Sequence, residues 1–348
     1  MQLALNIGYW GMPGTSTDIV TLAQEAETLG FSAVWAAEAY GSDAVTVLAT
    51  LAVRTSTIDI GSAVMQIPAR TPTMTAMTAA TLDEVSEGRF RLGLGVSGPQ
   101  VSEGWHGVRF ARPLARTREY VEVVRRALSR ETVEFSGEFH VLPLPDGPGK
   151  PLHLMLHPVR EHIPLYLGAI GPKNLELAGE IADGWLPLFF APGYVEDSLH
   201  HLAVGRSRAG NQAAFDIAPT VPLVCGRDPE ACADPVRSFA ALYVGGMGSR
   251  EQNFYHALAC RMGFTEAAEE IQRRYLAGDR AGASAAVPAE FIDATSLLGD
   301  AHRIAERLGA FADAGVRTLN VMPHGADTGE RVSALRTAAR ALELAGVG

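Results

Sequence analysis

The sequence has little of several features that would assign it to a specialised class. Its three cysteines, Cys225, Cys232 and Cys260, are odd in number and form no CxxC pair, which is typical of a protein of the reducing cytoplasm. No apolar run reaches the roughly 18 residues that span a bilayer. No basic segment or cleavage signal precedes the first apolar residues, Leu3 to Ile7. We therefore expect a cytoplasmic protein that is not embedded in a membrane.

Basic residues are also few. Against 29 Lys and Arg stand 39 Asp and Glu, so the formal net charge is −10 at pH 7. This balance argues against a nucleic-acid partner or an anionic membrane surface. An anionic ligand must instead be held by local backbone amides and a few basic side chains. The composition, 47% hydrophobic and 20% charged, is that of a globular protein with a sizeable core. The expected partner is a small-molecule substrate.

Short apolar segments alternate with helical patterns along almost the whole chain. Most of these segments are continuously apolar, as expected for parallel strands that are covered on both faces. The eight segments are residues 3–8, 33–37, 58–65, 90–96, 164–169, 184–188, 217–224 and 318–322. Eight β/α repeats predict an α/β protein with the (β/α)8 TIM-barrel fold. We expect a single domain over residues 1–348.

Capping signals and two long connections complete this outline. Thr17-Asp18, Thr71-Pro72 and Asp300 each precede a helical pattern, as side chains that accept a bond from the first turn do. After strand four, residues 130–160 are predicted to form a hairpin that turns at Ser136-Gly137, followed by a loop rich in Pro and Gly. After strand seven, residues 228–293 are predicted to form a largely helical insertion.

The end of the fifth segment is the most informative stretch. An apolar strand runs into Gly168, Ala169, Ile170 and Gly171, and Pro172 then opens a helix at a position that needs no N–H. The backbone amides converge on the helix N-terminus, where Lys173 adds a positive charge. Such a turn is suited to a phosphate or carboxylate, although an ordinary strand-to-helix turn is the alternative.

Residues 93–98 match the GxGxxG pattern. In a dinucleotide-binding fold this motif opens a helix at once and is followed by an acidic residue at the end of the next strand. Here Pro99 follows, and the next clear helix is expected only near Pro113. We therefore interpret Gly93, Gly95 and Gly98 as the carboxyl end, or mouth, of strand four. Glycines there let a flat ligand approach the backbone.

Two further mouths carry polar side chains. Glu38 and Asp43 flank the end of strand two; Asp43 is expected to cap the next helix, whereas Glu38 is free for a functional role. After strand four, Glu103, Trp105 and His106 could line a substrate pocket or simply pack within the loop.

Histidines do not suggest a metal centre. His153, His157 and His162 lie among prolines, and His200 and His201 are adjacent. Metal ligands must converge on one point, and a helix that would present His153 and His157 on one face is not expected in this Pro-rich stretch. We expect no metal site.

Taken together, these mouths resemble the luciferase-like monooxygenase superfamily, and within it the branch that uses the deazaflavin coenzyme F420. The resemblance covers essentially the whole chain and is carried by the order and spacing of several segments. These are residues 35–43, 89–100, 103–107, 168–174, 182–185 and 245–248, with Asn253, Phe254 and Tyr255.

The resemblance implies a barrel with coenzyme F420 lying across the carboxyl ends of the strands, or FMN in the alternative case. It also implies a bulge with a non-prolyl cis peptide at Ala63-Val64, behind the ring, and a tail phosphate on the turn that ends at Lys173. The cofactor-binding residues expected on this basis are Glu38, Ala39, Ala63, Val64, Gln66, Gly95, Val96, Ser97, Gly98, Gly168, Ala169, Ile170, Gly171, Pro172 and Lys173. Relatives are usually dimers, so a homodimer is expected.

The sequence departs from one branch of the superfamily. The F420-dependent sugar-phosphate dehydrogenases carry a His and a Glu where this chain has Ala39 and Pro99. Their absence favours a reductase of C=N or C=C bonds, resembling the methylene-tetrahydromethanopterin reductases. Glu38, Glu103 and His106 are the candidate catalytic residues. Two alternatives share the fold: an FMN-dependent monooxygenase supplied by a separate flavin reductase, and a non-catalytic flavin-binding subunit.

Overall fold

The computed structural model describes residues 1–8, 18–210, 212–248 and 250–348. Its main feature is an eleven-stranded sheet in which every strand pair is parallel. In the spatial order of the sheet the strands are β10 (Asp216–Ile217), β9 (Gly184–Trp185), β8 (Leu165–Gly168), β5 (Phe90–Gly95), β3 (Asp59–Ser62), β2 (Ala33–Ala36), β1 (Gln2–Asn6), β13 (Thr318–Pro323), β11 (Thr220–Cys225) and β12 (Leu297–Gly299), with β4 (Met65–Gln66) paired to β5.

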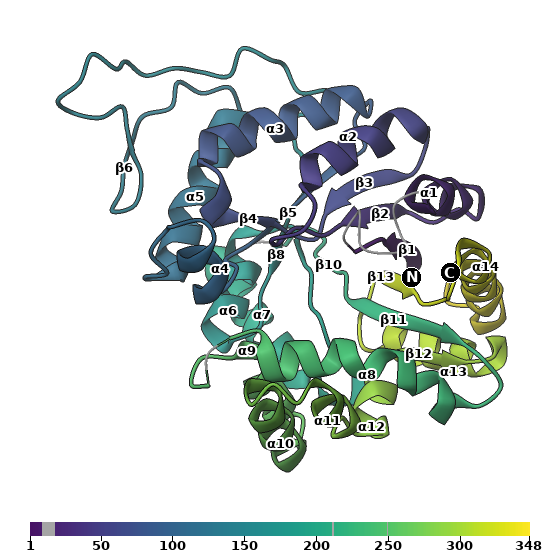
Figure 1. Cartoon of the computed structure of the whole chain (residues 1–348). Coiled ribbons are helices and arrows are strands. Elements are labelled where there is room, and N and C mark those ends of the chain that lie inside the picture. The colour runs from purple at the N-terminus through teal and green to yellow at the C-terminus, as the bar shows by residue number, and fades with distance from the viewer. Residues whose placement is uncertain (9–17, 211, 249) are drawn as a thin grey trace.

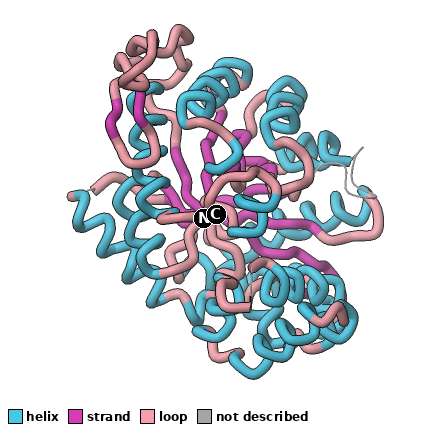
Figure 2. The backbone as a smooth tube through the Cα atoms, turned by 60° about the vertical axis from the view of Figure 1, so that its left-hand side comes forward, coloured by secondary structure: helices cyan, strands magenta, loops and turns pink. Residues whose placement is uncertain are grey.

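The sheet curls until its two sides meet at residues 216–225. On one side, the Ala218 N–H donates to the Trp185 carbonyl at 2.9 Å. On the other, the Asn320 N–H donates to the Pro219 carbonyl at 2.9 Å, and β11 continues in register with β13. Figure 2 shows the strands at the centre with the helices around them. This is an α/β fold with a curled parallel sheet surrounded by helices.

All eight segments that the sequence predicts as strands overlap strands of the structure, but two of them are split. The segment 58–65 divides into β3 and β4 around Ala63 and Val64, and the segment 217–224 divides into β10 and β11 at Pro219, which has no N–H to donate. The sequence analysis missed β12, a three-residue strand that pairs with β11 at the end of the strand order.

Long helices cover the outside of the sheet (Figure 1). They are α1 (Asp18–Thr28), α2 (Ala44–Arg54), α3 (Pro72–Val85), α5 (Pro113–Leu128), α6 (Pro172–Ile181), α7 (Glu196–Ala209), α13 (Ala301–Asp313) and α14 (Thr328–Ala345). Capping by Asp43, Thr71 and Asp300 is confirmed, because each side chain accepts a backbone N–H of the first turn. Thr17, the other predicted cap residue, lies outside the described residues.

The two long connections contain the elements expected in them. A hairpin of β6 (Phe135–Ser136) and β7 (Val141–Leu142) is closed by a bond from the Gly137 N–H to the His140 carbonyl, 2.9 Å long, and a loop without helix or strand follows it. Between β11 and β12 lie α8 (Pro229–Gly246), α9 (Phe254–Arg261), α10 (Thr265–Leu276), α11 (Arg280–Ala285) and α12 (Ala289–Ala294). Short 3-10 turns are η1 (Ile67–Ala69) and η2 (Pro192–Tyr194).

One expectation about helices was wrong. The sequence predicted no helix between Gly98 and Pro113, yet α4 (Pro99–Gly104) starts directly after the glycine-rich segment. Gly98 is its N-cap residue, and Pro99 occupies the first turn, where a missing N–H costs nothing because that group has no partner within the helix.

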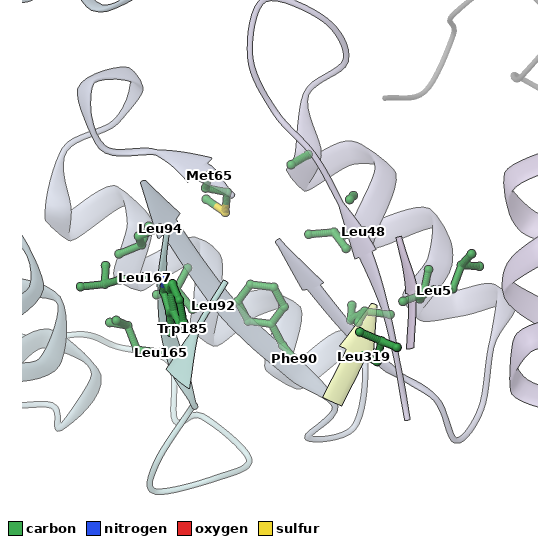
Figure 3. Close-up of a cluster of buried hydrophobic side chains, with 14 of the residues drawn as sticks. Leu5, Leu48, Met65, Phe90, Leu92, Leu94, Leu165, Leu167, Trp185 and Leu319 are labelled. Atoms are coloured by element: carbon green, nitrogen blue, oxygen red, sulfur yellow. The ribbon is translucent and has the colours of Figure 1, made fainter. Parts of the chain in front are cut away.

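Hydrophobic side chains alternate between the inside and the outside of the curled sheet. The larger cluster lies between sheet and helices and includes Leu5, Phe90, Leu92, Leu94, Leu165, Leu167 and Leu319 (Figure 3). The inner cluster is small and consists of Ala4, Ala33, Trp35, Tyr166, Leu186 and Ala218. Trp35 and Tyr166 meet edge to face with ring centroids 5.2 Å apart.

Next to this inner cluster, where the strands begin, a polar network joins several strands. Arg91 donates to Asp59 at 2.7 Å, while the Tyr166 hydroxyl and the Thr318 hydroxyl donate to the same oxygen of Asp216 at 3.0 and 2.9 Å. Burial and the nearby Asp216 carboxylate raise the pKa of Tyr166. The network ties strands on both sides of Asp216 together at the end of the barrel opposite the strand carboxyl ends.

The loop after β7 is anchored where it returns to the barrel. Asp83 of α3 is fully buried, and it accepts the backbone N–H of Arg160 at 3.1 Å and its Nε–H at 2.9 Å. The same guanidinium also donates to the Phe90 carbonyl.

No helix among the described residues is long and apolar enough to cross a membrane.

Asp83→Asn should destabilise the protein strongly. The amide would present N–H donors to Arg160 and leave a poorly solvated cation without its counter-charge, at a cost of about 3 kcal/mol. The matched control is Glu122→Gln, which removes a carboxylate from the exposed pair with Arg126 and should cost about 0.5 kcal/mol or less. Urea unfolding measures both; equal effects in the two variants would contradict the anchoring role of Asp83.

Candidate functional site

The carboxyl end of β3 forms the floor of the candidate site. The peptide bond between Ala63 and Val64 is cis, as the family resemblance predicted. Both side chains are partly exposed and pack on the inner cluster of the barrel. Val64 lies over two glycines of neighbouring strands: a Cβ atom at Gly95 would lie 2.5 Å from its Cγ2, and one at Gly168 would lie 3.6 Å from its Cγ1.

The glycine-rich segment has a packing role that accounts for its first glycine. The Ser62 hydroxyl donates to the Gly93 carbonyl at 2.8 Å and accepts the Gly93 N–H at 2.9 Å. A Cβ atom at Gly93 would lie 1.8 Å from the Ser62 carbonyl oxygen. Position 93 must therefore be glycine for β3 and β5 to approach each other this closely.

Glu38 follows β2 and is held by an arginine. Arg70 Nη1 donates to Oε2 of Glu38 at 2.6 Å, and Nη2 donates to Oε1 at 2.8 Å. The side chains of Glu38 and Arg70 are 6% and 16% exposed, so this pair is shielded from water. Arg70 also donates to Asp43 at 2.7 Å. The arrangement is a bidentate ion pair, the stronger kind of charged hydrogen bond.

The charges in this cluster stabilise each other. Burial alone would lower the pKa of Arg70, but the bonds and charges of Glu38 and Asp43 outweigh it, and the pKa is raised. Burial would raise the pKa of Asp43, but the bonds from Thr46 and the charge of Arg70 bring it below its usual value. Asp43 thus both caps α2 and holds Arg70.

Gln66 connects the Glu38 cluster to the mouth of β5. Its backbone N–H donates to Glu38 at 3.2 Å, and its side-chain amide donates to the Ala39 carbonyl at 2.7 Å. The Ser97 hydroxyl donates to the Gln66 side-chain oxygen at 3.0 Å. Ser97 has a φ of +61°, a left-handed conformation that is uncommon outside glycine. Residues predicted from three separate strand ends therefore form one network.

The turn from β8 to α6 presents an open helix N-terminus. Gly171 is the N-cap residue, and none of the described side chains caps the helix. A Cβ atom at Gly171 would meet no described atom within 4 Å. The first turn of a helix has N–H groups without intrahelical partners. Ala169 is buried, and its carbonyl accepts the Trp185 indole N–H at 2.9 Å. This end of α6 has the donors and the space for an anionic group.

Lys173 stands at that helix end, but its charge is already matched. Its Nζ donates to the two oxygens of Glu176 at 2.9 and 3.2 Å, and Arg208 donates to the same carboxylate at 3.1 Å. The bonds from Lys173 and Arg208 lower the pKa of Glu176 to about 2. The carboxylate therefore stays charged at neutral pH and keeps the lysine paired.

Glu103 and His106 lie on the loop around the end of α4. Glu103 accepts the Phe110 N–H at 3.0 Å and the Arg109 guanidinium at 3.5 Å, so it shapes the loop. His106 is partly buried, and its Nε2 has no partner among the described residues. Within the part of the chain that the structure describes, neither side chain bonds to the Glu38 network. Val96 lines a small hollow with Ile67 and Phe110 between this loop and the mouth.

Three residues at or near the mouths were missed in the sequence. Arg70 could have been found, because an arginine after strand three faces the acids after strand two. Arg261 of α9 donates to the Ile170 carbonyl at 3.3 Å from a position 91 residues away, a contact that no local pattern reveals. His324 follows β13, and its Nε2 is buried without a partner among the described residues. Burial, with the charge of Arg331, lowers the pKa of His324.

The described residues contain no group of three or more His, Cys, Asp or Glu side chains placed to hold a metal ion. The polar groups around the mouth are instead backbone amides, hydroxyls, one amide side chain and one buried ion pair. Such donors suit an organic ligand with an anionic group.

Comparison with known proteins gives concordant matches. A family model described as luciferase-like monooxygenase matches residues 5–318. A protein of Mycobacterium tuberculosis assigned as a coenzyme F420-dependent oxidoreductase is 41% identical over 345 residues, with 96% of this chain and 99% of the relative covered. The 5,10-methylenetetrahydromethanopterin reductase of Archaeoglobus fulgidus is 30% identical over 301 residues, with 84% and 85% covered.

A solved structure agrees with these sequence matches. The coenzyme F420-dependent tetrahydromethanopterin reductase of Methanopyrus kandleri superposes with a TM-score of 0.81 at 25% identity, and the alignment covers 97% of each chain.

The close contact of Val64 with Gly95 gives a prediction with a built-in control. Gly95→Ala should lower the free energy of unfolding by about 1–3 kcal/mol, because its new methyl group must displace Val64. Gly168 is the register partner of Gly95, and its Cβ would meet Val64 at an ordinary contact distance. Gly168→Ala should therefore cost less than about 1 kcal/mol. Equal losses for the two variants in denaturant titrations would contradict the described position of Val64.

Proposed function

Because the chain belongs to the luciferase-like monooxygenase family, we propose that it is a coenzyme F420-dependent oxidoreductase. The observation that carries this proposal is the 41% identity, over almost the full length of both chains, to a protein assigned as an enzyme of that kind. Its small-molecule substrate, its assembly as a homodimer and its cytoplasmic location are parts of the proposal that rest on the sequence.

The residues at the mouth fit such a coenzyme. Its flat ring needs a surface without projecting side chains. Gly98 and Gly168 are partly exposed and offer backbone beyond the end of β5 and at the end of β8, and Val64 lies over Gly95. Its anionic tail needs N–H donors and space, which the uncapped start of α6 at Gly171 offers. The remaining residues proposed to hold it are Glu38, Ala39, Ala63, Gln66, Val96, Ser97, Ala169, Ile170, Pro172 and Lys173.

When bound, the reduced coenzyme supplies a hydride from C5 of its deazaflavin ring. The protein's part is then to orient the ring and the substrate, to exclude water and to provide a proton where the product needs one. We place this chain among the reductases of C=N or C=C bonds. In support, it has Ala39 and Pro99 where the sugar-phosphate dehydrogenases have a His and a Glu, and a relative of 30% identity is a methylenetetrahydromethanopterin reductase.

The three acid–base candidates have different surroundings, which suggest different roles. Both oxygens of Glu38 already accept bonds from Arg70. We therefore assign Glu38 to holding the cofactor and Gln66, whose side chain in turn bonds the Ala39 carbonyl. The Nε2 of His106 has no partner among the residues that the structure describes, and Glu103 lies three residues before it, near the end of α4. One of these two supplies the proton in this proposal.

The coenzyme assignment predicts a preference that binding and turnover both measure. Oxidised F420 should bind more tightly than FMN in a fluorescence titration. With reduced F420 under anaerobic conditions, the enzyme should turn over an acceptor with a C=N or C=C bond, and oxygen should not be required. Oxygen uptake with reduced FMN, in the absence of any reaction with F420, would identify the protein as a monooxygenase instead.

Glu38→Gln tests the positioning role. The amide keeps the shape and can accept one of the bonds from Arg70, so the fold should persist while the charge-assisted pair is lost. We expect weaker binding of F420, by about tenfold, because hydrogen bonds to charged groups contribute about 1.5–3 kcal/mol. The kcat should fall less than the affinity. Unchanged affinity with a kcat lowered tenfold or more would assign proton transfer to Glu38.

A further inference from the structure

A helix from the long connection after β11 packs against the turn from β8 to α6. Leu258 and Met262, in and just after α9, line one hollow together with Ala169 and Ile170. Met262 is buried, so this apolar contact fixes the end of α9. Arg261, the last residue of α9, lies between these two contact residues and donates from Nη2 to the Ile170 carbonyl at 3.3 Å. A residue far away in the sequence thus brings a guanidinium group to the uncapped start of α6.

The two cations near this turn differ in their charge balance. Lys173 and Arg208 share the carboxylate of Glu176. By contrast, Arg261 is exposed, and no carboxylate among the described residues pairs with it. A guanidinium has five N–H donors in a planar fork, and its bond to Ile170 uses one of them. Arg261 therefore brings uncompensated charge and free donors to the place where the helix N-terminus already favours an anion.

We propose that Arg261 binds the phosphate of the coenzyme tail and is the main side-chain determinant of affinity for that group. This assignment rests on the proposed function, since it presumes that the tail lies at the start of α6. The planar fork of a guanidinium matches two phosphate oxygens with two parallel N–H bonds, whereas the ammonium group of a lysine acts as a point charge without that fixed geometry. Lys173, held by Glu176, contributes less. The insertion helix α9 consequently sets a preference for deazaflavins that carry a phosphate over those that lack it.

The test compares two ligands that differ only at the tail. F420 and the same deazaflavin with its ribityl chain but without phosphate are titrated against wild type, Arg261→Met, Arg261→Lys, Lys173→Met and Arg273→Met, with binding followed by fluorescence. Methionine keeps the apolar stem, and Arg273, which pairs with Glu270 on α10, controls for the change in net charge. The titrations are repeated at high salt, because screening weakens exposed charge contacts.

Arg261→Met should weaken F420 binding about tenfold or more, with the phosphate-free ligand changed by less than about twofold. Arg261→Lys should recover part of the loss, Lys173→Met should lose less than Arg261→Met, and Arg273→Met should match wild type. High salt should weaken the wild type more than Arg261→Met. Tight F420 binding that survives in Arg261→Met, or an equal loss for both ligands, would overturn the role of Arg261 alone. Failure of the wild type to bind F420 would overturn the proposed function as well.

Discussion

The site depends on the fact that the inside of the curled sheet is already full. Trp35 and Tyr166 fill the middle of the barrel edge to face, and Gly61 and Gly184 face them, since a Cβ at either glycine would come within 2.4 Å of a ring. The network around Asp216 occupies the end of the barrel at which the strands begin. A ligand can therefore approach only the carboxyl ends of the strands, where barrel enzymes generally bind their substrates.

At that edge, a few small residues serve both the fold and the site. Gly93 lets Ser62 bind the backbone of β5, and Gly95 makes room for Val64. Gly98 and Gly168, by contrast, are partly exposed and leave backbone open to a ligand at the same edge. The Glu38–Arg70 pair adds rigidity at one side of the floor, and the open start of α6 lies at the other. Under the proposed function, positioning by fixed backbone is thus the main contribution of this scaffold to hydride transfer.

The sequence predicted those parts of the structure that local patterns encode. Continuous apolar runs located all eight strand segments, and the Asp43 cap and the turn at Gly171 followed from short-range chemistry. The missing N–H of Pro219 could have predicted the break between β10 and β11, but the sequence analysis did not use it. The start of α4 at Pro99 was missed because a six-residue helix has no apolar period. The pair of Glu38 with Arg70 and the contact of Arg261 with Ile170 span 32 and 91 residues, so only the fold brings them together.

The proposed function requires that the mouth of this barrel binds a deazaflavin with an anionic tail. The most direct measurement exposes the purified protein to the mixed deazaflavin and flavin pools of a cell extract, removes the unbound molecules and identifies the retained ones by mass spectrometry. F420 should be retained in near-stoichiometric amount and FMN should not. Retention of FMN alone would contradict the assignment of F420.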